Sequence, residues 1–562
     1  MSGAGAVPGL GPRGAPAPIC GPTVASAADL GGQVRRGLVW STANNVVVRL
    51  ASLALGVVLA RLLSPGEFGV YAIALSVQAV LVAVADLGLS AELIRHDDAE
   101  RRAPTVATLA TSVGLVLTVL MIVTSHGLAT ALGSEQAGPT IAVLALTLVL
   151  AGFGVVPFAT LQRRFDQRSL FLVGAVDLLV SSAVTIGLLL AGAGVVSLAV
   201  GRVVAQCVTV ALQFVLAGQR PRFGLDRTLV RGVLAFGLPV AGANLLSWAV
   251  LGIDKVVLGR AVGVTALGFY VLAFNISAWP MTLVGQVVRS VSLPLFARLQ
   301  RAVGRSGVGP VHRGDPRLLA RVMAPVWVLA VLCGAGIAAV AAPLVLLLYG
   351  GRWAAAAPLV VPLAAFGALR VLADLFAAYL YALGRSRAVL GVQCLWFGSL
   401  VAGLLVGTRV AGVEGAAWAQ LVVAGGVVVT AYLLVVTAHG ASARALLGAL
   451  GPPAAVGVLA AFVGHRAAAL ATDHLAALLV GSATTLVVVA ALLGRWFLRR
   501  LREALPRRTS PGWRAEGRTT ADAATTSAAP VAASSSTVVA MPPAVTVATP
   551  AVLPTVVRTE AS

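Results

Sequence analysis

The sequence is poor in charged residues, and lysine is almost missing from it. Charged residues make up 11% of the 562 residues, against about a quarter in a typical soluble domain. Of the 41 basic residues only Lys255 is a lysine. It lies in IDKVV, so the chain has no Gly-Lys-Ser/Thr sequence of the kind that closes the phosphate-binding loop of ATPases. We therefore expect no ATP hydrolysis by this chain.

Cysteine and histidine are few and scattered. The six histidines form no HExxH motif, and the cysteines, which are Cys20, Cys207, Cys333 and Cys394, form no CxxC pair. This spacing argues against zinc sites and dithiol redox centres. We expect no metal, no cofactor and no catalytic residues, and we interpret the cysteines inside apolar segments as small packing residues.

Apolar residues fill most of the chain, 59% of which is hydrophobic. Runs of about 20 apolar residues are long enough to cross a bilayer. About fourteen such runs begin near residues 37, 69, 103, 138, 169, 195, 233, 267, 321, 356, 388, 415, 447 and 472. The sequence predicts an all-α, polytopic membrane protein of about 14 transmembrane helices. Residues 1–32 and 497–562 are predicted to be cytoplasmic tails, the first disordered and the second basic and then disordered.

The positions of the cations predict the orientation. If the N-terminus is cytoplasmic, 28 of the 41 basic residues lie in cytoplasmic segments. The outer connections hold five, namely Arg61, Arg260, Arg352, Arg409 and Arg466. The positive-inside rule then places both termini in the cytoplasm. The net charge of +21 is on this interpretation a topology signal, and we expect no nucleic-acid partner.

One segment occurs twice. VVLARLLSPGEFGVYAIA (57–74) and VVLGRAVGVTALGFYVLA (256–273) share seven identities at an offset of 199, and these are Val57, Val58, Leu59, Arg61, Gly69, Tyr71 and Ala74 with their counterparts. An offset of six helices preserves orientation, so the copies predict parallel repeats. We expect an N-lobe (33–232), a C-lobe (233–440) and two additional helices in 441–496. Alternatively, the repeated arginines anchor helix ends, and Gly69 and Gly268 allow tight turns.

Several segments in order carry a family resemblance. They are LARLLSPGEFGVYAIALSVQAVLVAVADLGLSAELIR (59–95), PFATLQRRFDQRSLF (157–171), GAGVVSLAVGRVVAQ (192–206), GIDKVVLGR (252–260) and LPLFARLQ (293–300). The chain resembles Wzx-like polysaccharide exporters, the lipid-linked oligosaccharide flippases of the colanic-acid and teichuronic-acid branch of the multidrug/oligosaccharidyl-lipid/polysaccharide superfamily.

That resemblance implies a MATE-like fold of two six-helix lobes around a central cavity, often with two extra helices. It also implies a bacterial cytoplasmic-membrane protein that moves undecaprenyl-diphosphate-linked oligosaccharide from the inner to the outer leaflet. The expected partners are the lipid-linked glycan, membrane lipid and other polysaccharide-assembly proteins.

Charges at membrane depth are the candidate site residues, because they are costly there. The cations are Arg49, Arg202, Lys255, Arg289 and Arg370, and the carboxylates are Asp86, Asp177, Asp254 and Asp374. Arginine suits a pyrophosphate because its planar fork donates in pairs. Arg49, with Asn45 one turn back, is the first candidate by depth, and Arg202 follows.

The remaining intramembrane charges have competing interpretations. Arg370 is a third candidate cation for the pyrophosphate, but Asp374 follows it at i, i+4, a spacing that favours a local ion pair. Lys255 and Arg289 lie near helix ends and can snorkel. Asp177 is a candidate for coupling transport to protons or sodium, with structural pairing as the alternative.

Two other functions fit a chain of this kind. A membrane glycan polymerase or glycosyltransferase would need acidic groups on larger outer loops, and here the outer loops are short. A drug exporter of the same superfamily would favour an acidic or aromatic cavity, whereas the intramembrane charges are five cations and four carboxylates.

Gly403 and Gly407 form a GxxxG pattern that predicts close helix packing.

Overall fold

The computed structural model describes residues 54–86, 89–95, 98–164, 166–278, 317–383 and 385–504. The chain divides into two compact units, Met1–Ala51 and Ser52–Ser562, and every described residue belongs to the second. Within these ranges the regular structure is helical and no strand occurs. The predicted all-α fold is confirmed, while both predicted tails lie almost wholly outside the described residues.

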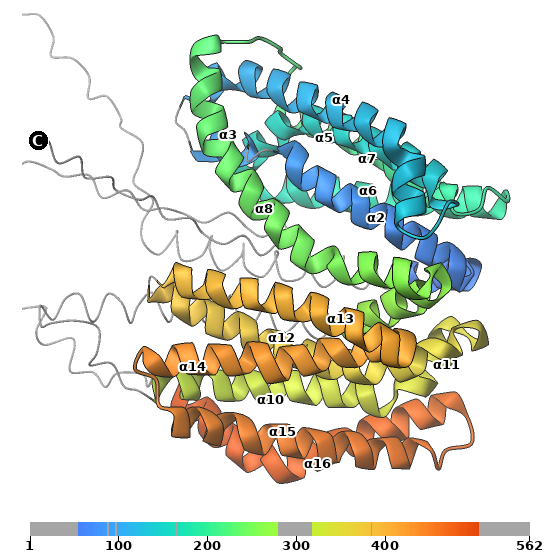
Figure 1. Ribbon diagram of the computed structural model, residues 1–562, viewed down its shortest axis with the longest axis vertical. Coiled ribbons are helices and arrows are strands. Elements are labelled where there is room, and N and C mark those ends of the chain that lie inside the picture. The colour runs from blue at the N-terminus through green and yellow to red at the C-terminus, as the bar shows by residue number, and fades with distance from the viewer. Residues whose placement is uncertain are drawn as a thin grey trace, which may run out of the picture. The chain divides into compact units, whose positions relative to one another are not determined.

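Helices of the predicted N-lobe follow one another with short connections. They are the segment 54–62, α2 (Pro65–Asp86), α3 (Leu89–Arg95), α4 (Ala99–Ala131), α5 (Ala137–Arg163), α6 (Gln167–Leu190) and α7 (Val196–Ala217). α5 packs against α2, α4 and α7, and α6 packs along α7 (Figure 1). A capping box starts α2: the Ser64 N–H and hydroxyl donate to the Glu67 carboxylate, and the Glu67 N–H donates back to the Ser64 hydroxyl.

The predicted C-lobe begins with α8. Its elements are α8 (Arg227–Val262), the helix Val264–Ala278, α10 (Leu318–Ala339), α11 (Ala341–Tyr349), the short helix η1 (Gly351–Ala356), α12 (Ala357–Ala382), α13 (Ser386–Val422), η2 (Val423–Val429) and α14 (Thr430–Ala438). α8 begins before the expected boundary at 233 because Asp226 caps it, accepting hydrogen bonds from the N–H and hydroxyl of Thr228.

α13 runs through two expected spans. Its backbone leaves helical geometry at Ala411 and Gly412, and Gly412 has φ 56°, a value that favours glycine. Beyond this bend the chain packs closely back on itself. The approach is so close that a Cβ on Gly407 would lie 2.4 Å from the Gly415 oxygen. A Cβ on Gly403 would likewise lie 2.9 Å from the Val423 side chain. The prediction of close packing at the GxxxG pattern is confirmed.

Two further helices, α15 (Ala443–Ala468) and α16 (His474–Ala504), complete the described chain. They pack against each other and both pack against α10, as Figure 1 shows at the bottom of the view. Ser442 caps α15 by accepting a hydrogen bond from the Ala445 N–H. These are the two additional helices expected from the sequence.

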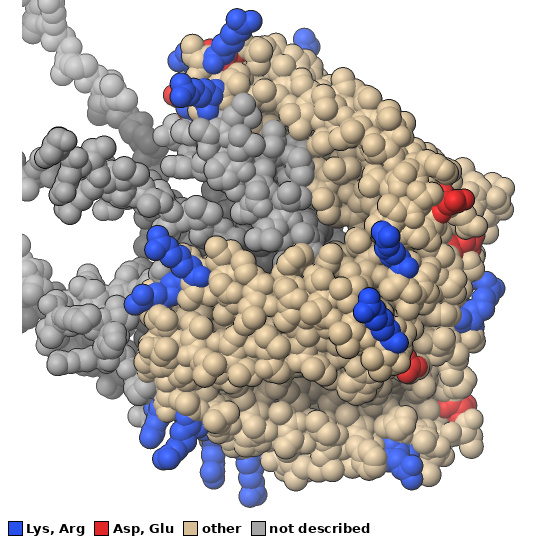
Figure 2. Space-filling view, in the orientation of Figure 1, with Lys and Arg blue, Asp and Glu red and all other residues tan. Residues whose placement is uncertain are grey.

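The described part of the chain contains ten helices long and apolar enough to cross a membrane. One of them, Ser386–Ala438, is 53 residues long and includes the bend. On the face shown in Figure 2, charged side chains lie toward the left and right edges, and a broad uncharged surface separates them. The chain is a multi-pass membrane protein. The count of fourteen stays a prediction, because the helices expected near 37 and 267 extend outside the described residues.

The two copies of the repeated segment meet at their glycines. Gly69 lies in α2 and Gly268 in the helix Val264–Ala278. A Cβ on Gly69 would lie 1.8 Å from the Val264 oxygen, and one on Gly268 would lie 1.9 Å from the Pro65 oxygen. The expectation of tight turns at these glycines is wrong. Both lie inside helices, where the missing side chain lets the two backbones touch.

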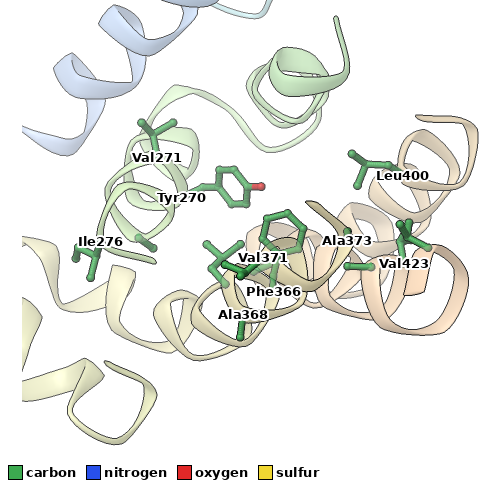
Figure 3. Close-up of a cluster of buried hydrophobic side chains, with 14 of the residues drawn as sticks. Tyr270, Val271, Ile276, Phe366, Ala368, Val371, Ala373, Leu400 and Val423 are labelled. Atoms are coloured by element: carbon green, nitrogen blue, oxygen red, sulfur yellow. The ribbon is translucent and has the colours of Figure 1, made fainter. Parts of the chain in front are cut away.

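Large buried side chains join the repeated segments to the rest of the core. Trp353 of η1 is fully buried, and its ring lies edge-on to Phe68 at 5.5 Å and to Phe269 at 5.9 Å. Figure 3 shows a neighbouring cluster in which Tyr270 and Phe366 lie among smaller apolar side chains. The repeats therefore form part of the core and are not surface appendages.

Candidate functional site

The charged side chains predicted at membrane depth come together as pairs. Those in the described residues form three pairs, Arg202 with Asp177, Lys255 with Asp254, and Arg370 with Asp374. Arg49, Asn45 and Arg289 lie outside the described ranges, as does the side chain of Asp86. Every intramembrane cation whose side chain the structure describes thus has a carboxylate neighbour.

Arg202 of α7 and Asp177 of α6 form a direct ion pair. The Arg202 Nη1 atom lies 3.0 Å from Asp177 Oδ2, and the two side chains are 43% and 28% exposed. The Asp177 carboxylate is therefore paired in this structure, and its role in coupling transport to an ion stays a prediction. The pair joins neighbouring helices, so no spacing within one helix could have predicted it.

Tyr71 of α2 lies beside this pair. Its side chain is within electrostatic reach of both Arg202 and Asp177. Tyr71 is among the repeated residues, but sequence reasoning assigned it no role in a site. The available signal was that this tyrosine is one of the few polar residues shared by both copies of the repeat.

The second copy of this tyrosine also belongs to a polar network. The Tyr270 hydroxyl donates to Asp254 Oδ2 at 3.0 Å and accepts from Gln420 Nε2 at 3.0 Å. All three residues are buried. The backbone N–H of Lys255 donates to Asp254 Oδ1 at 2.8 Å, and Lys255 Nζ lies 3.9 Å from the same oxygen. This network ties α8, the helix Val264–Ala278 and α13 together, and sequence reasoning missed Gln420.

Arg370 of α12 is less exposed than Arg202. Its Nε lies 3.6 Å from Asp374 Oδ1, and its guanidinium carbon lies 4.6 Å from the ring centre of Trp396. The Arg370 side chain is 16% exposed. The i, i+4 ion pair is therefore confirmed. The cation–π contact covers one face of the guanidinium and holds its plane against the Trp396 ring.

These differences rank the described cations by what they can bind. A guanidinium has five N–H donors in a planar fork, and Asp177 takes one nitrogen of Arg202. The donors that Asp177 does not take can pair with a phosphate group, and the Arg202 side chain is 43% exposed. In the described ranges no three His, Cys, Asp or Glu residues cluster as a metal site would require. The arrangement suits anion binding by Arg202.

Comparison with known proteins agrees with this membrane architecture. The polysaccharide biosynthesis protein family matches residues 58–358, more than half of the chain. Succinoglycan biosynthesis transport protein ExoT of Rhizobium meliloti (strain 1021) is 26% identical over 338 residues, covering 59% of this chain and 66% of its own. Teichuronic acid biosynthesis protein TuaB of Bacillus subtilis (strain 168) is 27% identical over 338 residues, covering 58% of this chain and 67% of its own.

Lipopolysaccharide biosynthesis protein WzxC of Escherichia coli (strain K12) is 23% identical over 271 residues, covering 47% of this chain and 54% of its own. The chain thus matches between about half and two thirds of the length of these relatives.

Two solved structures share the fold. The lipid II flippase MurJ, in an inward closed conformation, gives a TM-score of 0.66 at 12% identity, covering 82% of this chain and 99% of its own. An inward-facing MATE-family multidrug transporter gives a TM-score of 0.55 at 18% identity, covering 70% of this chain and 95% of its own. The expected MATE-like fold is shared with these two structures. With more than half of its length matched, the chain belongs to the polysaccharide biosynthesis protein family.

Proposed function

We propose that this chain moves an undecaprenyl-diphosphate-linked oligosaccharide from the inner to the outer leaflet of a bacterial cytoplasmic membrane by alternating access. The family match supports this proposal, as do relatives named as a transport protein and as polysaccharide biosynthesis proteins. The fold is shared with a protein named as a lipid II flippase. The chain is a transporter on this proposal, and its residues do no covalent chemistry.

The observation that carries the proposal is the accessible Arg202 guanidinium in a membrane-spanning helix. A pyrophosphate with an attached glycan cannot cross hydrocarbon without cations and hydrogen-bond donors. Arg202 offers such donors at 43% exposure, with the Tyr71 side chain nearby. Cargo phosphate would take over Arg202 from Asp177 by exchanging one anion for another, so no uncompensated cation is created.

The same exchange gives Asp177 a second role. Once phosphate holds Arg202, the carboxylate has lost the partner that lies 3.0 Å away. It is then free to bind a proton or a sodium ion, which would couple ion movement to cargo binding. Arg49, Asn45 and Arg370 complete the proposed set of cargo-binding residues, and Arg370 ranks last because Trp396 and Asp374 already hold it.

Orientation and domain limits belong to the same proposal. Both termini are cytoplasmic, the N-lobe comprises 33–232 and the C-lobe 233–440, helices 13 and 14 fall in 441–496, and the tails are 1–32 and 497–562. The cation distribution supports this orientation.

Labelling with an impermeant reagent in intact cells tests the orientation, using single cysteines introduced at Glu135 and Arg385. Glu135 should react and Arg385 should not; the opposite pattern would contradict the orientation.

Deleting the gene tests the transport proposal. We expect lipid-linked glycan to accumulate on the inner leaflet and surface polysaccharide to be lost, and a plasmid copy should restore both. An Arg49→Ala copy should fail to restore export at normal abundance. Unchanged glycan together with altered drug resistance would instead support a drug exporter. Loss of glycan chain length with normal flipping would support an enzyme that extends the glycan.

A further inference from the structure

Arg61, at the end of the segment 54–62, reaches from the predicted N-lobe to the C-lobe. Its Nε donates to the Leu348 carbonyl at 2.7 Å, and its Nη2 donates to the Leu347 carbonyl at 2.6 Å. Both acceptors lie in the last turn of α11, where carbonyl groups have no partner within the helix. The fork of a guanidinium matches two adjacent carbonyls, and its charge opposes the negative end of the helix dipole.

Arg260, which matches Arg61 at the offset of 199, makes the reciprocal contact. Its Nη1 lies 3.5 Å from the carbonyl of Ala131, the last residue of α4. The neighbouring backbones also touch, because a Cβ on Gly133 would lie 2.6 Å from the Gly259 oxygen. The C-lobe thus contacts the end of an N-lobe helix through Arg260, and the N-lobe contacts the end of a C-lobe helix through Arg61. The longer distance makes Arg260 the weaker of the two.

Trp353 adds a third connection beside Arg61. Its Nε1 donates to the Ala60 carbonyl at 2.7 Å, and its ring packs edge-on against Phe68 and Phe269. Ala60 precedes Arg61 and matches Gly259, which precedes Arg260. The same two positions of each repeat therefore contact the opposite lobe.

We propose that Arg61, Arg260 and Trp353 form a latch that holds the two lobes together on the face carrying the arginine-poor connections. This inference rests on the proposed transport function, since alternating access requires the lobes to part on each face in turn. The positive-inside rule makes this the outer face. A closed latch therefore corresponds to access from the cytoplasm, and release of cargo outside requires the latch to open.

The chemistry of the latch suits repeated opening. Both arginines are exposed, so water can replace the carbonyls as they separate. The acceptors are helix-end carbonyls, which water also satisfies at little cost. Phe68 lies in the N-lobe, whereas Phe269 and Trp353 lie in the C-lobe, so parting the lobes also removes the contact between Phe68 and Trp353. The arginines thus give a reversible polar contact, while the aromatic contact favours closure.

Distance measurement between spin labels tests the latch. The labels are placed at Glu135→Cys in the N-lobe and Arg466→Cys in the C-terminal helices, both exposed positions, after the native cysteines are replaced by serine. The purified protein is measured in lipid nanodiscs without cargo. We expect Arg61→Gln to shift the ratio of short to long distances toward the long form by about tenfold, the effect of losing a charge-assisted hydrogen bond.

The other variants separate a latch from a cap that only stabilises helix ends. Arg260→Gln should give a smaller shift than Arg61→Gln, and Trp353→Phe, which keeps the ring but loses the donor, should also lengthen the distance. Arg409→Gln, at another arginine-poor connection, is the matched control and should change nothing. If the three latch variants lower the melting temperature but leave the distances as in the control, the arginines are caps and the latch is excluded. Because no cargo is present, this outcome is independent of whether the chain flips a glycan.

Discussion

The guanidinium of Arg202 and the carboxylate of Asp177 lie 3.0 Å apart across the contact between α7 and α6. Removing one member of such a pair leaves an unpaired charge at membrane depth, whereas removing both leaves none. Single and double substitutions therefore have different consequences for folding. The same variants have different consequences for cargo binding, because only the cation attracts phosphate.

Arg202→Gln should lower glycan export by at least about tenfold, the effect of losing one charge-assisted hydrogen bond. It should also lower protein abundance, since Asp177 loses its partner. Arg202→Gln with Asp177→Asn should restore abundance but not export. Export is measured as surface polysaccharide per molecule of transporter, and Arg202→Lys, which keeps the charge but not the fork, should fall between Arg202→Gln and the unchanged protein. Recovery of export in the double variant would mean that the pair only stabilises the fold.

The glycine contact between the repeats predicts a large effect on stability. Gly69→Ala places a Cβ only 1.8 Å from the Val264 oxygen, and Gly268→Ala places one only 1.9 Å from the Pro65 oxygen. The helices must separate, which costs about 2 kcal/mol or more in overpacking. Thermal unfolding of the detergent-purified protein should show this loss for either variant. Gly187→Ala, in α6 with no atom within 4 Å of its Cβ, is the control and should be neutral or slightly stabilising.

Apolar length and charge asymmetry were enough to predict the fold in outline. α4, α5, α6 and α10 each begin within a few residues of their predicted starts, because a bilayer dictates span length. α8 begins further ahead of its predicted start, because Asp226 caps it before the apolar run, and the Ser64–Glu67 capping box likewise sets the start of α2. Such caps are visible in the sequence, but hydropathy gives them no weight.

The site was predicted less completely, for a physical reason. Arg370 and Asp374 lie on one helix, so their spacing alone revealed the pair. Arg202 and Asp177 lie on different helices, and the pairing depends on how α6 rotates against α7, which a single sequence does not determine. Gln420 contacts Tyr270 across 150 residues, and an isolated glutamine in an apolar helix gives no indication of its partner.

The N-terminus of α6 should respond to acid. The hydroxyl and N–H of Ser169 donate to Asp166 and hold the pKa of its carboxyl below the ordinary value of 3.8. Because the pKa is lowered in the folded state, the stabilisation is present above that ordinary value and is lost as the pH falls through the folded pKa. The protection factor of the Ser169 amide against hydrogen exchange should therefore fall below about pH 4. Asp166→Asn keeps an acceptor at the cap but cannot titrate, so an equal acid response in that variant would disprove the assignment.

Arg370, the lowest-ranked of the proposed cargo ligands, differs from Arg202 in how strongly it holds the fold together. Its guanidinium stacks on Trp396 and pairs with Asp374, so Arg370→Lys should keep the charge but lose the planar stack. We expect a loss of about 1–2 kcal/mol in the free energy of unfolding, the size of a partly buried cation–π contact, and a smaller loss of export per molecule than in Arg202→Lys. Arg202→Lys should show the reverse, with stability nearly kept and export reduced, because a lysine offers phosphate a point charge in place of a fork. Measuring unfolding and export on the two variants side by side decides the matter. If Arg370→Lys abolishes export without loss of stability, Arg370 contacts the cargo and its ranking below Arg202 is wrong.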